Sequence, residues 1–241
     1  MSPANKVLTK HALLTQYSYK IELHAHSHPA SICGHFSPEE LVQIYADLGY
    51  DAMVLTNHFV RDYLDGLSIE DATAKHLEDY HRARQAAQTC GLRVYLGVEA
   101  RFTENSNDYL IYGADEPILR KIAQYWELGV EAFRREVPLP RSVFIQAHPF
   151  RDGMTQIDPT LLDGLEVYNM HPRQNSRNAV AAVYAREHRL TIRTAASDCH
   201  RPGDAGNTAI RTAVLPEDSF ALAQILRSGD YLLQIGDDLL L

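Results

Sequence analysis

The chain has 241 residues, of which 45% are hydrophobic and 22% are charged. These values are typical of a globular protein and exclude a chain that is disordered over its whole length. The length suits one large α/β domain better than two ordinary domains, and the net charge of −8 argues against a general nucleic-acid-binding surface. Histidine is unusually frequent, with 12 copies, and it is both the commonest metal ligand and the usual acid–base residue near neutral pH.

The apolar segments and the cysteines indicate the cellular location to expect for the protein. No stretch approaches the roughly 18 consecutive apolar residues that cross a bilayer, and residues 1–16 lack the apolar core of a signal peptide. Three cysteines, Cys33, Cys90 and Cys199, form no Cys-x-x-Cys pair and are odd in number. We therefore expect no disulfide scaffold, no membrane contact and a cytoplasmic location.

Predicted strands and helices alternate along the chain. Apolar runs bounded by turn residues predict strands at 20–24, 51–56, 92–98, 109–112, 143–147, 165–168, 190–195, 208–214 and 231–235. Helical spacing and capping residues predict helices at 37–48, 68–90, 115–136 with a break near Gly129, 175–188 and 216–227. Repeated βα units indicate a mainly parallel sheet, either closed as a barrel or open and doubly wound.

Potential metal ligands lie where the predicted strands end. In chain order these ligands are His24 and His26, His58, Glu99, His148, Asp198 and His200. The carboxyl ends of strands form the face where barrel enzymes and open α/β sheets carry their sites. Alternate residues of a strand point to one face, so each His-x-His or Asp-x-His pair can chelate. Five imidazoles and two carboxylates on one face predict a metal site.

The other histidines divide into two groups. Those in loops near the predicted site are His28, His35 and His171. Those in the N-terminal segment or in polar helices are His11, His76, His81 and His188. We expect the second group to be solvated, with His76 and His81 on the surface of one helix.

The residues between the ligands resemble a known family. The segment ELHAHSHPASICGHFSPEELVQIYADLGYDAMVLTNHF is similar to the opening of a PHP (polymerase and histidinol phosphatase) domain. Further along, GVEARF, QAHPF and SDCH resemble the glutamate motif, the middle histidine motif and the closing DxH motif of that family. The motifs occur in the family's order from about Lys20 to Asn207.

The resemblance implies a fold and a metal centre. The fold would be a distorted (β/α)7 TIM-like barrel, formed by residues 1–241 as a single α/β domain, with two or three divalent ions (zinc, manganese or iron) at its C-terminal face. One ion would be held by His24, His26, Glu99 and Asp198. Glu99 would bridge to a second ion held with His148, and the third-metal or substrate side would be completed by His58 and His200.

Two positions depart from the family pattern. Asn57 stands where the family has an aspartate before the second-motif histidine, and a neutral amide would orient His58 more weakly. No histidine lies between Glu99 and His148, so one ion could be missing or could be held by Asp108 instead.

The loop after His26 offers a further ligand. Family members place one more ligand in this loop, where this chain has Cys33 and His35. Either side chain could bind a metal ion, and a buried Cys33 with a solvent-facing His35 is an equally good alternative.

The predicted activity is hydrolysis of a small phosphate mono- or diester, with histidinol phosphate as one example. Divalent ions would reverse the charge of the ligand cluster and attract an anion into an acidic protein. A hydroxide bridging the ions would attack phosphorus in line. We expect catalytic roles for Glu99, His58 and His200, and substrate contacts from Arg101, Arg151 and His171. The general acid is left open among His58, His171 and His200.

Two other classes of function compete with this interpretation. An amidohydrolase-type hydrolase also begins with His-x-His, but typically adds a metal-bridging lysine where this chain has Glu99. A metal-binding module with weak or no catalysis is favoured by Asn57 and by the missing histidine. The sequence identifies neither the physiological substrate nor the oligomeric state.

Overall fold

The computed structural model describes residues 9–64 and 66–240. Its strands are β1 (Tyr19–Ala25), β2 (Ala52–Leu55), β3 (His58–Val60), β4 (Arg93–Arg101), β5 (Asp108–Tyr112), β6 (Val143–Gln146), β7 (Gly164–Asn169), β8 (Ile192–Ala196), β9 (Thr208–Thr212), β10 (Leu232–Ile235) and β11 (Asp238–Leu240). Its α-helices are α1 (Lys10–Gln16), α2 (Pro38–Asp47), α3 (Ile69–Ala87), α4 (Glu116–Tyr125), α5 (Gly129–Glu136), α6 (Asn178–Glu187) and α7 (Ser219–Ser228). Short 3-10 turns follow β3 at Arg61–Tyr63 and precede β7 at Pro159–Leu161.

The strands form one strongly curled sheet. Their order is β11-β10-β9-β1-β2-β4-β5-β6-β7-β8, with β3 paired to β4. The segment after β8 returns to β1, where Cys199 pairs with Ala25, donates to the His24 carbonyl (3.2 Å) and accepts from the His26 amide (3.0 Å). These bonds draw the end of β8 against β1, and they confirm the predicted α/β fold with a distorted TIM-like barrel.

The prediction of a mainly parallel sheet is wrong. Five of the ten strand pairings in the described residues are parallel and five are antiparallel. The connection 102–107 between β4 and β5 has no helix, and β10 and β11 are separated only by residues 236–237. Connections this short cannot carry the chain back for a parallel neighbour, so these pairs form antiparallel ladders.

The helices begin and end close to the predicted residues. Ser37 and Glu40 form the predicted capping box of α2, and Ser68 caps α3. The predicted break near Gly129 separates α4 from α5. The predictions omitted α1, β3 and β11.

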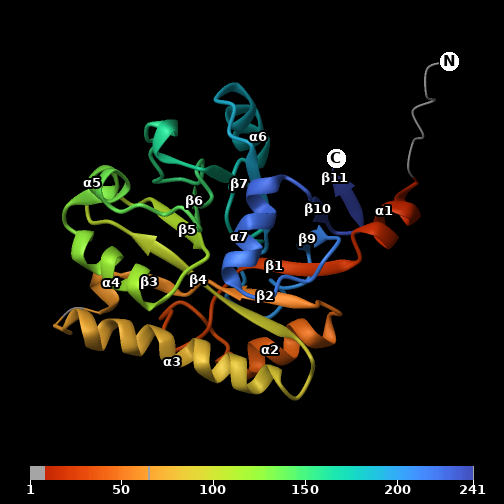
Figure 1. Ribbon diagram of the computed structural model, residues 1–241, viewed down its shortest axis with the longest axis horizontal. Helices are drawn as coiled ribbons and strands as arrows, with labels where there is room; N and C mark the ends of the chain where they lie inside the picture. The colour runs from red at the N-terminus through yellow and green to blue at the C-terminus, as the bar shows by residue number, and fades with distance from the viewer. Residues whose placement is uncertain (1–8, 65, 241) are drawn as a thin grey trace.

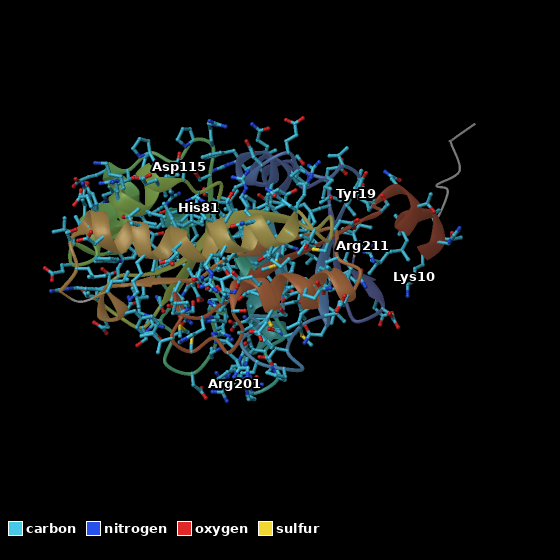
Figure 2. The ribbon with its side chains drawn as sticks, turned by 90° about the horizontal axis from the view of Figure 1, so that it is seen from below. Lys10, Tyr19, His81, Asp115, Arg201 and Arg211 are labelled. Carbon is cyan, nitrogen blue, oxygen red and sulfur yellow. The ribbon has the colours of Figure 1, made fainter. Side chains whose placement is uncertain are left out.

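Helices flank the curled sheet on several sides. Figure 1 shows α2 and α3 side by side below the sheet, α4 and α5 at its left and α7 across its front. Figure 2 turns the molecule so that α3 crosses the near face, with His81 labelled beside it. None of the helices in the described ranges combines the length and apolarity needed to cross a membrane.

Gly164 permits the close contact of β7 with β8. A Cβ atom there would meet the backbone carbonyl oxygen and the side chain of Ile192. We expect Gly164→Ala to lower the free energy of unfolding by about 1–3 kcal/mol, the usual cost of overpacking, as measured by urea denaturation. Gly203→Ala is the matched control, because nothing lies within 4 Å of its Cβ position and only its positive φ of 88° is strained. A Gly164→Ala variant that is as stable as the wild type would contradict this account.

Candidate metal centre

Seven side chains that the sequence predicts as metal ligands meet at one end of the curled sheet. Glu99, on β4, lies at the middle of this cluster. Its Oε1 is 3.3 Å from His24 Nε2 and 3.1 Å from His148 Nε2. Its Oε2 is 3.3 Å from His26 Nε2 and 2.8 Å from His58 Nδ1. One carboxylate therefore faces four imidazoles.

Asp198 supplies the second carboxylate, from the segment after β8. Its Oδ1 lies 3.4 Å from Nε2 of both His24 and His26. The same oxygen is 3.3 Å from His200 Nδ1. The structure thus brings all seven residues together, and their assignment as metal ligands stays a prediction.

The cluster has the properties of a site built for cations. Glu99, His24 and His26 are fully buried. The atoms His24 Nε2 and His26 Nε2 are buried without a hydrogen-bond partner, although each faces carboxylate oxygens at 3.3–3.4 Å. Buried polar atoms left in this state are costly, and a divalent ion would satisfy both. The ligand atoms of these three residues also lie within 4.8 Å of one another, so the donor set fits a metal ion.

The carboxylates and the imidazoles of the cluster shift one another's pKa values. Burial raises the pKa of Glu99 and of Asp198, but the surrounding histidines outweigh burial and hold both pKa values well below normal. Burial, together with His200 and His58, lowers the pKa of His26 well below 6.5. Burial lowers the pKa of His24 and of His58, but Asp198 and Glu99 outweigh burial at His24, and Glu99 outweighs it at His58, so both pKa values lie well above 6.5. The two carboxylates are therefore ionised and His26 is neutral, while a divalent ion would have to displace the protons of His24 and His58.

Glu166, on β7, is a site residue that the sequence prediction missed. Its Oε1 accepts from His24 Nδ1 at 2.8 Å, which leaves Nε2 of that ring to face Glu99 and Asp198. Its Oε2 accepts from the backbone amide of His148 and from Asn169 Nδ2, both at 2.9 Å. The available signal was a charged residue in the buried strand GLEVYN, because buried carboxylates require partners.

Two of the candidate ligands have an unusual backbone. His148 has φ of 30° and Asp198 has φ of 53°, in the left-handed region that non-glycine residues rarely adopt. Glu166 holds the His148 amide, while Arg151 Nη2 contacts Asp198 Oδ2 at 2.7 Å. Strained backbone of this kind persists where surrounding bonds enforce it, and it clusters at functional sites.

Asn57 does not contact the His58 ring directly in the described hydrogen bonds. Its Oδ1 accepts from the Ser27 amide (2.7 Å) and from Ser31 Oγ (3.0 Å). Because the only Ser31 hydroxyl proton goes to Asn57, Ser31 Oγ accepts from His26 Nδ1 (3.1 Å) and from the His58 amide (2.9 Å). Asn57 therefore acts through Ser31, and this chain of bonds turns His26 Nε2 toward the carboxylates.

Asp79, on α3, explains why an amide fits at position 57. Asn57 Nδ2 lies 3.4 Å from Asp79 Oδ2, which also accepts from Ser27 Oγ (2.8 Å) and from the Ala30 amide (3.1 Å). Both residues are 1% exposed. An aspartate at position 57 would bring two buried carboxylates together.

His76 was predicted to be solvated, and this prediction is wrong. The side chain is 3% exposed and packs at the edge of the Phe59 ring, with 5.0 Å between ring centroids. Burial lowers its pKa to about 4. The buried stripe of α3 consists of Ala72, Thr73, His76, Asp79, Ala83 and Ala87. This stripe contains no large apolar residue. The spacing of hydrophobic residues in the sequence therefore did not indicate which face of α3 is buried.

The predicted substrate-binding arginines are paired with carboxylates. Arg101 donates from Nε and Nη2 to Asp108 Oδ1 and Oδ2, both at 2.8 Å. Asp108 Oδ2 lies 3.8 Å from His148 Nε2, and Asp108 forms a potential ligand group with His58 and Glu99. Asp108 therefore lies beside the cluster. It is the residue that the sequence analysis named as a possible ligand in place of the histidine that this chain lacks between Glu99 and His148.

The remaining predicted residues lie at the outer side of the cluster. His171 is partly buried, 5.6 Å from the His200 ring between centroids, and burial lowers its pKa. Burial opposes ionisation of the Cys33 thiol, but hydrogen bonds with His200 and His58 lower its pKa to about 6. Of the two side chains in this loop, Cys33 is partly buried and His35 is exposed.

Comparison with known proteins identifies the family. A model of the PHP domain matches residues 22–193. The chain belongs to the PHP domain family. No curated protein matches the chain.

Three solved structures resemble this PHP chain at low sequence identity. A two-domain protein from Bacteroides vulgatus, containing a predicted PHP-like metal-dependent phosphoesterase, matches 92% of this chain with 17% identity and a TM-score of 0.64. This chain covers 66% of that protein, less than two thirds of its length. A protein from Bifidobacterium adolescentis, described provisionally as a metal-dependent phosphoesterase, matches 86% of this chain and 95% of its own, with 18% identity and a TM-score of 0.51.

The third structure is an amidohydrolase from Chromobacterium violaceum with bound sulfate and no metal. It matches 90% of this chain and 98% of its own length, with 17% identity and a TM-score of 0.51. Identities this low establish a shared fold and leave the reaction to be argued from the site itself.

Glu166 provides a test of how the ligands are held. We expect Glu166→Gln to lower metal affinity by about 10–100-fold, the usual effect of losing a carboxylate behind a ligating histidine. An amide cannot accept from both His24 and the His148 amide with the two atoms that Glu166 uses. Metal content after equilibrium dialysis measures the effect, with Glu187→Gln on the exposed face of α6 as control. Unchanged affinity in Glu166→Gln would refute the assigned role.

The pair of Asn57 and Asp79 provides a second test. We expect Asn57→Asp to lower the free energy of unfolding at neutral pH by about 1–3 kcal/mol, because like charges in contact are unfavourable when buried. The reversed pair Asn57→Asp with Asp79→Asn should recover most of that loss. Chemical denaturation of the wild type, the two single variants and the double variant gives the coupling energy. Additive losses would show that the two side chains do not interact.

Proposed function

We propose that this protein hydrolyses a small phosphate mono- or diester at a centre of two or three divalent ions, such as zinc, manganese or iron. The observation that carries the proposal is the buried contact of Glu99 and Asp198 with five imidazoles, which leaves buried donor atoms without partners. Bound ions would supply an activated water and would neutralise charge that develops on the phosphoryl oxygens.

The residues of the chain would hold the ions and the substrate. His24, His26, Glu99 and Asp198 form the innermost donor set. Glu99, which faces four imidazoles, is the residue suited to bridge two ions. His58 and His200 lie at the outer side, where their side chains are 11% and 13% exposed. This position lets either one act on the reacting groups as well as on an ion.

Substrate contacts are assigned to Arg101, Arg151 and His171. Asp108 uses Nε and Nη2 of Arg101, which leaves Nη1 for a phosphoryl oxygen. Arg151 is held by Asp198 and by Asn169, and its Nε is buried without a partner. Guanidinium groups fixed in this way match the oxygens of a phosphate. The partner of the site is therefore a small phosphorylated molecule, and the acidic chain offers no general surface for nucleic acid.

The chemistry of the cluster favours this reaction over that of an amidohydrolase. An amidohydrolase-type site typically contains a lysine that bridges two metal ions. Among the described residues, the charged groups against the clustered histidines are carboxylates, with Glu99 in contact with four imidazoles and Asp198 with three.

The experiment is metal loading followed by a broad assay. The protein is stripped of metal, reloaded with manganese, zinc or iron, and assayed with a panel of phosphate mono- and diesters. We expect hydrolysis that depends on metal, and we expect His26→Ala and Asp198→Ala to lose bound metal and more than about 100-fold of activity, beyond the effect of residues that merely support ligands. His81→Ala, on the exposed side of α3, is the control and should retain both.

Two results would overturn the proposal. The first is a fully metal-loaded protein that hydrolyses no ester of the panel. The second is stoichiometric metal in both ligand variants, which would place the ions elsewhere in the molecule.

A further inference from the structure

A cavity of about 250 Å³ lies beside the histidine cluster. Its walls come from the end of β3 with the 3-10 turn that follows, and from the end of β4 with the connection to β5. The side chains that line it include Val60, Asp62, Tyr63, Arg101, Asn105 and Ser106. Pockets for drug-sized ligands measure roughly 300–1,000 Å³, so this cavity suits one part of a small molecule.

The pairing of β3 with β4 places the cavity next to the candidate metal centre. His58 pairs with Glu99, and Val60 pairs with Arg101. Side chains two residues apart on a strand point to the same face, with their Cα atoms roughly 7 Å apart. The contact of 2.8 Å between His58 and Glu99 shows that this face carries the cluster. Val60 and Arg101 therefore line the cavity one step beyond the candidate ligands on the same face.

Two side chains of the cavity also contact residues of the cluster or beside it. Arg101 holds Asp108 with two bonds of 2.8 Å, and Asp108 Oδ2 lies 3.8 Å from His148 Nε2. The Tyr63 ring meets the His58 ring edge to face, with 5.7 Å between ring centroids. An ester whose phosphoryl group lies at the ions would therefore have room to extend its organic group past Arg101 and Tyr63 into the cavity.

Several hydrogen-bonding groups of the cavity are available to a ligand. Asn105 uses Oδ1 for the Asn107 amide at 2.8 Å, which leaves its Nδ2 to donate elsewhere. Within residues 9–64 and 66–240, the hydroxyls of Tyr63 and Ser106 form no hydrogen bond. A hydroxyl can both donate and accept, so these groups can bind the hydroxyls of a ligand in either direction.

The charges around the cavity favour hydroxyl groups over a second anion. Arg101 is paired with Asp108, and Arg61 is paired with Glu127. The Asp62 carboxylate is exposed and forms no ion pair in the described part of the chain. A second phosphate or carboxylate in the cavity would meet this negative charge while both cations are already paired, whereas a ligand hydroxyl can donate to the carboxylate.

We propose that this cavity binds a hydroxylated organic group, a polyol or sugar with neighbouring hydroxyls, whose phosphate lies at the metal centre. The inference rests on the proposed function, because that function places the phosphoryl group at the ions. It adds the chemical class of the alcohol that hydrolysis would release. The hydroxyls of Tyr63 and Ser106 would select this alcohol over an apolar one of the same length.

Three phosphonates test the inference, because a phosphoesterase does not hydrolyse their carbon–phosphorus bond. Methylphosphonate carries little more than the anionic group, butylphosphonate adds an apolar chain, and 3,4-dihydroxybutylphosphonate adds two neighbouring hydroxyls to the same chain. Isothermal titration calorimetry measures their binding to the manganese-loaded protein. We expect the dihydroxybutyl compound to bind about tenfold more tightly than the butyl compound, as two added hydrogen bonds would give.

A double variant tests whether the cavity is the place of binding. Tyr63→Phe with Ser106→Ala removes both hydroxyls and keeps the aromatic ring. We expect the preference for the dihydroxybutyl compound to fall to about threefold or less, while methylphosphonate binds as in the wild type and thus shows that the metal centre is intact. Tyr19→Phe with Ser18→Ala is the matched control, because this pair lies at the start of β1, away from the strand ends that carry the cluster.

The outcomes separate this inference from the proposed function. Equal binding of the butyl and dihydroxybutyl compounds by the wild type overturns the inference, as does a failure of all three phosphonates to bind. A preference that the double variant retains in full overturns the assignment of the cavity. A protein that hydrolyses phosphate esters without this preference loses only the inference, whereas a protein with the preference and no hydrolysis keeps the binding site and loses the proposed function.

Discussion

The burial of Glu99 and Asp198 is the constraint on which the rest of this structure depends. Two carboxylates that are at most 1% exposed must be compensated, because an isolated buried charge is very costly. Five imidazoles surround them at 2.8–3.4 Å. Histidine alone does not complete the compensation, since several donor atoms still lack partners, and this deficit is what a divalent ion would remove.

A second layer of residues determines which atom each histidine presents. Glu166 fixes His24 from one side, and Asn57 reaches His26 through Ser31 from another. In each histidine, Nδ1 donates its proton to the supporting residue, Glu166 or Ser31. Nε2 of each ring therefore faces Glu99 and Asp198. These supports come from β7 and from the turn after β2, and α3 adds Asp79 behind them. The orientation of the site is therefore enforced by elements that carry none of the predicted ligands.

The same compensation accounts for the unusual backbone of His148 and Asp198. Both residues adopt a strained left-handed backbone conformation. This conformation places His148 against Glu99 and Asp198 against His24. Glu166 and Arg151 hold them there by hydrogen bonds. Glu99 contacts both His24, on β1, and His148, which follows β6 and has a left-handed backbone. This shared carboxylate links β1 to the end of β6. The outer side of the cluster is organised differently, since the loop of Cys33 is attached there through His200.

The sequence by itself determined the strand-end placement of the seven predicted ligands, the family and most element boundaries. Strand ends, capping residues and ordered motifs are local features, and local features are readable along the chain. Only the tertiary structure decided the antiparallel pairings of β4, β5 and β6 and the inward position of His76 and Asp79. It also decided the contact of Glu166 with His24 and with the His148 amide. These features depend on which segments, far apart in the sequence, the curled sheet brings into contact. A local pattern of residue types does not specify those contacts.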